Sequence, residues 1–81
     1  MKSEEIAKRV VALVTQIAPD VEAAAVLPDV DFRDQFDFDS MDTLNFAIAL
    51  NKEFGIEVPE ADYAKLASTD KCVKYVQGKL D

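Results

Sequence analysis

The sequence predicts a small all-α protein, a bundle of three to four helices with a long loop between the first and second helix. Hydrophobic residues recur at helical spacing in several segments, and no segment forms a convincing strand pattern. Hydrophobic residues make up 49% of the chain, which favours a folded protein over a disordered one. With 81 residues, the chain is expected to be a single domain, residues 1–81, with a modest core.

The first helix is expected from residue 4 to residue 17, with Ser3 as its N-cap. Its hydrophobic residues follow helical spacing: Ile6, Val10, Leu13, Val14 and Ile17. The helix should end before Pro19, because proline disfavours the helical conformation of the residue before it. A long connection to Asp39 follows, with helical turns expected near residues 21–26 and 32–36. So long a connection in so small a domain usually has a function of its own.

The second helix is expected from residue 40 to residue 54, with Gly55 as a left-handed C-terminal residue. At about 100° per residue, its hydrophobic residues fall into two stripes on nearly opposite faces. The first stripe consists of Phe46, Ala47, Leu50 and Phe54, and the second of Met41, Leu44 and Ile48. The first stripe can pack the core. The second is either covered by the long loop or exposed for partners, and the sequence leaves both alternatives open.

Two further helices are expected in the last third of the chain. Pro59 opens a short third helix that reaches about Leu66, and Ser68 or Thr69 caps the fourth. The residues expected to be buried on the fourth helix are Val73, Val76 and Leu80.

The net charge of −7 is concentrated in the middle of the chain. Residues 20–62 contain twelve acidic residues against two basic ones, Arg33 and Lys52, whereas the two ends together contain four acidic and seven basic residues. The acidic middle disfavours binding to nucleic acid, whose phosphates it would repel. It favours attraction to partner proteins with basic patches, although ordinary solubility explains acidity as well.

Composition also excludes several classes of function. The chain has no histidine, the commonest general base and metal ligand, so neither an enzyme nor a metal site is predicted. Its single cysteine, Cys72, cannot form an internal disulfide and is expected to be a packing residue. No segment approaches the ~20 apolar residues of a membrane span, and the N-terminus does not resemble a signal peptide. A cytoplasmic protein without membrane insertion is therefore expected.

Asp37-Phe38-Asp39 resembles the opening of a calcium-binding loop, but the rest of such a loop is missing. Asp42 stands where the loop needs glycine, and Ile48 stands where it needs the closing glutamate. No calcium site is therefore predicted.

Ser40 is the most informative residue, because it lies at the expected start of the second helix. Free backbone N–H groups and the helix dipole favour a phosphate at such a position. The alternative is that Ser40 or Asp39 simply caps the helix, which is the commonest role of these residues. The local sequence leaves both interpretations open.

Four features together resemble one known family. Residues 39–42 (Asp-Ser-Met-Asp) precede an apolar helix, residues 53–60 (Glu-Phe-Gly-Ile-Glu-Val-Pro-Glu) follow it, a last helix begins after residues 68–69, and Phe32 lies in the loop ahead of the serine. Combined with helix order, length and acidity, these features resemble the acyl carrier proteins, the phosphopantetheine-binding carrier domains. The resemblance covers essentially the whole chain.

The resemblance implies that Ser40 carries a covalent 4′-phosphopantetheine arm, transferred from coenzyme A by a separate magnesium-dependent phosphopantetheinyl transferase. The thiol of the arm would hold acyl groups as thioesters and deliver them to acyl-transferring or condensing enzymes of fatty-acid, polyketide or related biosynthesis. Nothing in the sequence activates Ser40 as a nucleophile, so the chain is expected to be a substrate of the transferase and not a catalyst. A monomer is expected.

Two sets of site residues accompany this interpretation. The residues expected to dock basic partner enzymes are Asp39, Met41, Asp42, Leu44, Ile48 and Glu57. The residues expected to form a pocket for the acyl chain are Phe32, Phe46, Leu50, Phe54, Val58, Leu66 and Val73.

The chain departs from the family pattern at two places. Bacterial fatty-acid carriers usually have Gly-Ala-Asp where residues 37–39 are Asp-Phe-Asp, and glutamates where Asn45, Asn51 and Lys52 stand. The resemblance is therefore to an atypical member with reduced acidity on the second helix. A carrier of a dedicated secondary pathway, including an aminoacyl or peptidyl carrier, is one alternative. An unmodified acidic helical module that binds partners through the second stripe is another.

Overall fold

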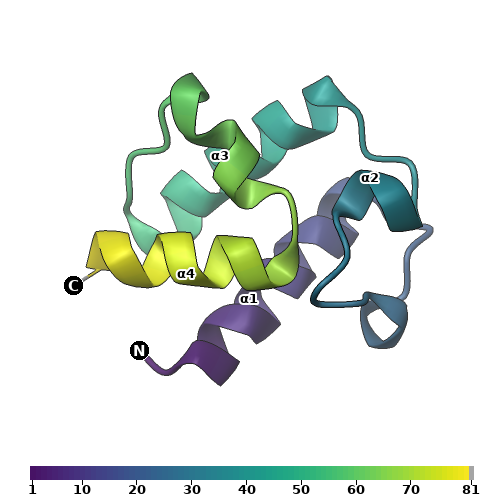
Figure 1. Ribbon diagram of the computed structural model, residues 1–81, viewed down its shortest axis with the longest axis horizontal. Coiled ribbons are helices and arrows are strands. Elements are labelled where there is room, and N and C mark those ends of the chain that lie inside the picture. The colour runs from purple at the N-terminus through teal and green to yellow at the C-terminus, as the bar shows by residue number, and fades with distance from the viewer. Residues whose placement is uncertain (81) are drawn as a thin grey trace.

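The computed structural model describes residues 1–80 and confirms the all-α fold, with no strand in that range. Its elements are α1 (Ser3–Ile17), η1 (Ala23–Ala25), α2 (Phe32–Gln35), α3 (Ser40–Phe54), η2 (Glu60–Leu66) and α4 (Thr69–Leu80), where η denotes a 3-10 helix. Figure 1 shows α1, α3 and α4 crossing one another, with the loop that contains η1 and α2 at one end of the bundle. The helical turns expected in this loop correspond to η1 and α2.

The core lies between the three long helices. α1 packs against both α4 and α3, and η2 packs against α4 and α3. The fully buried hydrophobic side chains come from every layer of this packing: Ile6, Val10, Val14, Phe32, Phe46, Leu50, Leu66, Cys72 and Val76. The first predicted stripe of α3 thus faces the core, although Phe54 at its end is only partly buried.

The prediction that Ser3 caps α1 is wrong. Lys2 occupies the N-cap position with an extended backbone and makes no side-chain capping bond, while Ser3 is already the first helical residue. The Ser3 hydroxyl instead accepts a hydrogen bond of 2.8 Å from Gln77 Nε2. Its side chain therefore joins α1 to α4, a tertiary contact that the local pattern does not encode.

The prediction that α4 buries Leu80 is also wrong. Val73 and Val76 are buried as expected, but Leu80 is 41% exposed. It is the last residue of α4, where the helix has reached the edge of the bundle (Figure 1). Hydrophobic residues continue at helical spacing as far as Leu80, but no neighbouring element covers this side chain.

A hydrogen bond between side chains holds η2 on α4. The Tyr75 hydroxyl donates to Asp62 Oδ2 at 2.7 Å. This bond is the main cause that lowers the pKa of Asp62 below its ordinary value of 3.8. Burial, and then the same bond, raise the pKa of Tyr75 from 10.0 to about 12.

Replacing Tyr75 by phenylalanine should destabilise the fold in a pH-dependent way. The lowered pKa of Asp62 adds stability above its unfolded pKa of 3.8, and this contribution is lost as the pH falls through the lower folded pKa. The raised pKa of Tyr75 adds stability below its unfolded pKa of 10.0, and this contribution is lost as the pH rises towards about 12.

The free energy of unfolding of Tyr75→Phe should therefore lie furthest below that of the wild type between about pH 5 and pH 9. The difference in unfolding free energy between variant and wild type should narrow on both sides of this window. Urea titrations at several pH values measure this difference. A difference that does not change with pH would contradict the link between this bond and the two pKa shifts.

Candidate functional site

The N-terminus of α3 is closed by a capping box between two aspartates. Asp39 is the N-cap, and its Oδ1 accepts a hydrogen bond of 2.9 Å from the Asp42 backbone N–H. Asp42 Oδ2 in turn accepts a bond of 3.1 Å from the Asp39 backbone N–H. The structure thus assigns the cap to Asp39, and Ser40 is the exposed first residue of α3.

The Ser40 hydroxyl therefore takes no part in the cap. It lies beside the free backbone N–H groups of the first turn, where the helix dipole favours a negatively charged group. The two carboxylates of the capping box add opposing negative charge at the same end. A phosphate on Ser40 would be stabilised by the backbone and not by these side chains.

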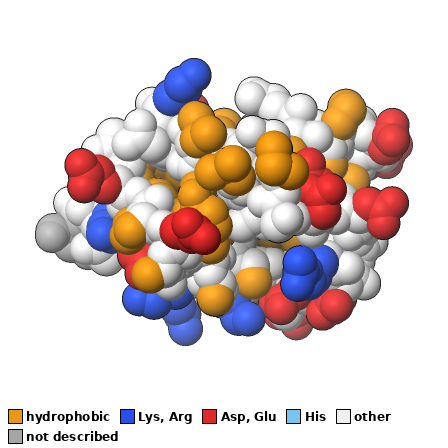
Figure 2. All heavy atoms as spheres, turned by 90° about the horizontal axis from the view of Figure 1, so that it is seen from above, with side chains coloured by type: hydrophobic (Ala, Val, Ile, Leu, Met, Phe, Trp, Pro, Cys, Tyr) orange, Lys and Arg blue, Asp and Glu red, His pale blue; other side chains and the backbone are white. Residues whose placement is uncertain are grey.

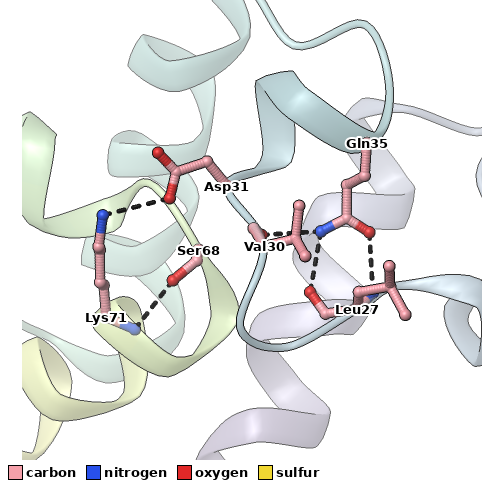
Figure 3. Close-up of polar contacts among 6 residues, drawn as sticks. All are labelled: Leu27, Val30, Asp31, Gln35, Ser68 and Lys71. Carbon is pink, nitrogen blue, oxygen red and sulfur yellow. Dashed lines mark hydrogen bonds and ion pairs between the residues drawn. The ribbon is translucent and has the colours of Figure 1, made fainter.

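The loop ahead of α3 is closed by the side-chain amide of Gln35. Gln35 Nε2 donates to the carbonyl oxygens of Leu27 at 2.8 Å and Val30 at 2.9 Å, and Gln35 Oε1 accepts from the Leu27 backbone N–H at 2.8 Å. Figure 3 shows the amide lying between these backbone groups. These three bonds fold the loop between residues 27 and 35 back on itself and give α2 a fixed position.

A second set of contacts, also drawn in Figure 3, ties this loop to the start of α4. Lys71 Nζ and Asp31 Oδ1 form an ion pair at 3.2 Å. The Ser68 hydroxyl accepts a bond of 3.2 Å from the Lys71 backbone N–H, so Ser68, and not Thr69, caps α4. The cap and the ion pair therefore meet on one residue, Lys71.

Two backbone hydrogen bonds reinforce the same junction. The Phe32 N–H donates to the Ala67 carbonyl at 2.8 Å, and the Asp70 N–H donates to the Pro28 carbonyl at 3.0 Å. The loop is consequently bonded to Ala67 and to the first turn of α4 by both its backbone and its side chains.

Four phenylalanines cluster between this loop and α3. The ring centroids of Phe32 lie 5.8 Å from Phe36, 5.3 Å from Phe38 and 5.8 Å from Phe46. Phe38 also lies 5.9 Å from Phe36 and 6.0 Å from Phe46. These spacings are those of favourable aromatic pairs. The set of predicted pocket residues omitted Phe36 and Phe38, although their alternation with acidic residues ahead of Ser40 is a signal that the loop turns an apolar side inward.

A cleft of about 460 Å³ opens beside Ser40. Its lining includes Phe32, Phe38 and Leu66, together with two cationic side chains, Arg33 and Lys71. The cleft is thus bordered by α2, the start of α3, η2 and the start of α4.

The structure distributes the seven predicted pocket residues over two environments. Phe32 and Leu66 line the cleft and are also part of the core. The other five belong to or pack against the same core: Phe46, Leu50, Phe54, Val58 and Val73. The cleft therefore ends on the outer surface of a core that these side chains fill.

The second stripe of α3 is not covered by the loop. Met41 is 61%, Leu44 38% and Ile48 48% exposed. Figure 2 shows hydrophobic side chains gathered in the middle of the face seen from above. Glu57 lines a hollow of about 490 Å³ together with Ile48. The structure thus decides between the two alternatives for this stripe, which is exposed and lies next to an acidic side chain.

Asn51 has a structural role that the sequence did not reveal. Its Nδ2 donates to the Ile56 carbonyl at 2.7 Å, across the left-handed Gly55 whose φ is 67°. Asn51 thereby closes the C-terminus of α3. Its difference from the family pattern is therefore tied to the geometry of this turn as well as to the charge of the surface.

The described residues contain neither a reactive thiol nor a metal-binding cluster. Cys72 is buried, and burial raises the pKa of its thiol to about 12, so it stays protonated at neutral pH. Among residues 1–80 the structure brings together no group of three or more His, Cys, Asp or Glu side chains that could hold a metal ion. No helix in that range is long and apolar enough to cross a membrane.

Comparison with known proteins agrees with this geometry. Residues 7–76 match the family model described as phosphopantetheine attachment site. The chain is 31% identical over 81 residues to the acyl carrier protein of Thermosynechococcus vestitus, a match that covers 99% of this chain and 98% of the relative. It is 32% identical over 79 residues to the acyl carrier protein of Prochlorococcus marinus, with 98% of each chain covered. The chain therefore belongs to the phosphopantetheine attachment-site family of carrier proteins.

Proposed function

We propose that this chain is an acyl carrier protein and that the Ser40 hydroxyl is the attachment point of its 4′-phosphopantetheine arm. The observation that carries this proposal is the capping box, because Asp39 caps α3 and leaves the exposed hydroxyl of Ser40 available. Ser40 also lies within the residues matched by the family model. The arm would end in a thiol that holds acyl groups as thioesters.

The position of Ser40 suits a phosphodiester. Attachment breaks one P–O bond in the diphosphate of coenzyme A, whose nucleotide half leaves as adenosine 3′,5′-bisphosphate, and replaces the O–H bond of the serine with an O–P bond. The product keeps one negative charge next to the first turn of α3. The helix dipole would stabilise that charge by about 0.3–1 kcal/mol. The exposed hydroxyl can be reached by an enzyme without unfolding α3.

The chain does not supply the base that such a transfer needs. It has no histidine, and the capping box commits the carboxylates of Asp39 and Asp42 to backbone N–H groups. The base that takes the serine proton must therefore come from a phosphopantetheinyl transferase. In this reaction the carrier is a substrate.

The exposed stripe of α3 is the surface that we assign to partner docking. Met41, Leu44 and Ile48 give it apolar area, and Asp39 and Glu57 give it negative charge. Apolar contact would stabilise a complex, while the charges would steer partners with basic patches. We propose acyl-transferring and condensing enzymes of fatty-acid, polyketide or related biosynthesis as these partners.

The substitution Ser40→Ala should abolish modification without unfolding the protein. With coenzyme A and a purified phosphopantetheinyl transferase, the wild type should gain the mass of one phosphopantetheine group and the variant none. Because Asp39 provides the cap, the loss in unfolding free energy should stay below the ~0.5–2 kcal/mol typical of losing a cap residue.

The matched control is Thr43→Ala, which removes another hydroxyl that lines the same cleft. It should be modified normally. Modification of Ser40→Ala would refute the site. A wild type that no transferase modifies would favour an unmodified interaction module instead.

The substitution Asp39→Asn tests electrostatic docking while keeping the cap, because asparagine caps helices as well as aspartate does. Removal of one exposed charge should slow modification by a basic partner about 1.5–5-fold at low salt. The effect should shrink at 1 M salt, where the Debye length is about 3 Å. Transfer rates at the two salt concentrations provide the measurement.

Glu5→Gln removes an exposed acid from α1, away from the stripe, and serves as the control. It should leave the rate unchanged at both salt concentrations. Equal effects of the two substitutions would mean that only net charge matters, and the stripe would not be the docking surface.

A further inference from the structure

The basic residues of this acidic chain gather around two hollows. Of nine Lys and Arg residues in the sequence, five line either the cleft beside Ser40 or a second hollow of about 820 Å³ over η2 and α4. We call the second one the lysine hollow, after its four lysines: Lys65, Lys71, Lys74 and Lys79. Figure 2 shows Lys and Arg side chains along the lower margin of the face seen from above.

The lysine hollow adjoins the cleft beside Ser40. Ala64 and Lys71 line both of them. A continuous surface therefore leads from the Ser40 hydroxyl, past the Phe-lined cleft, to the exposed side of α4. An arm attached to Ser40 can lie along this surface.

Ion pairs within the chain do not account for this positive charge. Lys71 pairs with Asp31 at 3.2 Å, and Lys65 lies 3.7 Å from Asp62, a carboxylate that also accepts the bond from Tyr75. Lys79 lies over the ring of Tyr75 at 5.5 Å. Among residues 1–80, Lys74 and Lys79 have no ion-pair partner. Four lysines thus share two paired carboxylates, and Lys79 also borders the hollow that contains Glu57. Even with Glu57 counted, the lysine hollow keeps a positive balance in a chain of net charge −7.

Gly78 leaves part of the wall of the lysine hollow without a side chain. Glycine inside a helix is less stable than alanine, and a Cβ at Gly78 would meet no atom within 4 Å. Packing therefore does not require this glycine. It lines the lysine hollow with Ala64, so two of the smallest residues border an apolar space next to four ammonium groups.

We propose that the lysine hollow is a docking site for the cargo of the carrier's own arm when that cargo ends in a carboxylate. This inference rests on the proposed attachment at Ser40. The methylene groups of the cargo would cover Ala64, Gly78 and the Tyr75 ring, and the carboxylate would face Lys74 and Lys79. An uncharged cargo of the same length would contact only the apolar part of the lysine hollow.

The covalent arm makes binding in so exposed a hollow effective. Ion pairs at a protein surface are weak, so a free carboxylate would bind poorly. A carboxylate held on an arm anchored beside the hollow is present at an effective concentration in the millimolar range. Docking is then an intramolecular equilibrium that salt can weaken.

Two synthetic arms of equal length provide the test. One carries a glutaryl group with a free terminal carboxylate, and the other carries the same group with a terminal amide. Both are joined to the arm through an amide in place of the thioester, so that they resist hydrolysis. Intact mass first verifies loading. A wild type that cannot be loaded speaks against the proposed function, whereas a loaded protein tests the docking site alone.

The glutaryl form should melt about 1–5 °C above the amide form at low salt, and backbone amide resonances of residues 71–79 should shift only in the glutaryl form. In Lys74→Ala/Lys79→Ala the difference between the two cargoes should disappear, and 1 M salt should have the same effect on the wild type. Gly78→Leu, whose larger side chain fills the open space, should also reduce the difference in melting temperature between the two cargoes without unfolding the protein.

The control is Lys8→Ala, which removes an exposed lysine of α1 and should preserve the difference. Equal melting temperatures and equal spectra for the two cargoes would overturn the proposal. It would also be overturned if the α4 variants weakened binding to partner enzymes equally for both cargoes, since the lysines would then form a surface for an acidic protein.

Discussion

The capping box between Asp39 and Asp42 is the constraint on which the candidate site depends. Because each carboxylate accepts the backbone N–H of the other residue, α3 begins at Ser40. Within this helix, the period of 3.6 residues per turn determines which residues share a face. The two bonds leave the serine hydroxyl available at the end of a helix that buries Phe46 and Leu50 in the core and presents Met41 and Ile48 on the surface.

The loop before α3 holds this helix start against the rest of the molecule. The Gln35 amide closes the loop, Phe32 and Phe38 anchor it on α3 through Phe46, and Asp31 joins it to Lys71. The cleft beside Ser40 is the space left between these anchored parts. A serine on a capped helix is thereby placed at the opening of a groove, and that groove continues towards the lysines of α4.

The sequence predicted the helices well and the contacts between them poorly. The bounds of α3 agree with the prediction, because Asp39, Ser40 and Gly55 are strong local signals of helix ends. The contacts of Gln35, Ser3 and Asn51 join residues that local patterns do not relate, and helical spacing continues through Leu80 although the core does not. For the site, the sequence placed Ser40 at the start of the helix and the second stripe on a separate face, but it left the exposure of both open. The structure decides both, and the roles of Phe36, Phe38 and Gln35 also depend on how the loop folds back.

Phosphorus NMR of the protein after reaction with coenzyme A and a transferase tests the central claim most directly. A phosphodiester on Ser40 should give one resonance that couples to the Ser40 β-protons and does not shift with pH near neutrality. Simple phosphorylation would instead give a monoester that titrates with a pKa of about 6. A titrating resonance, or coupling to any residue other than Ser40, would contradict the account.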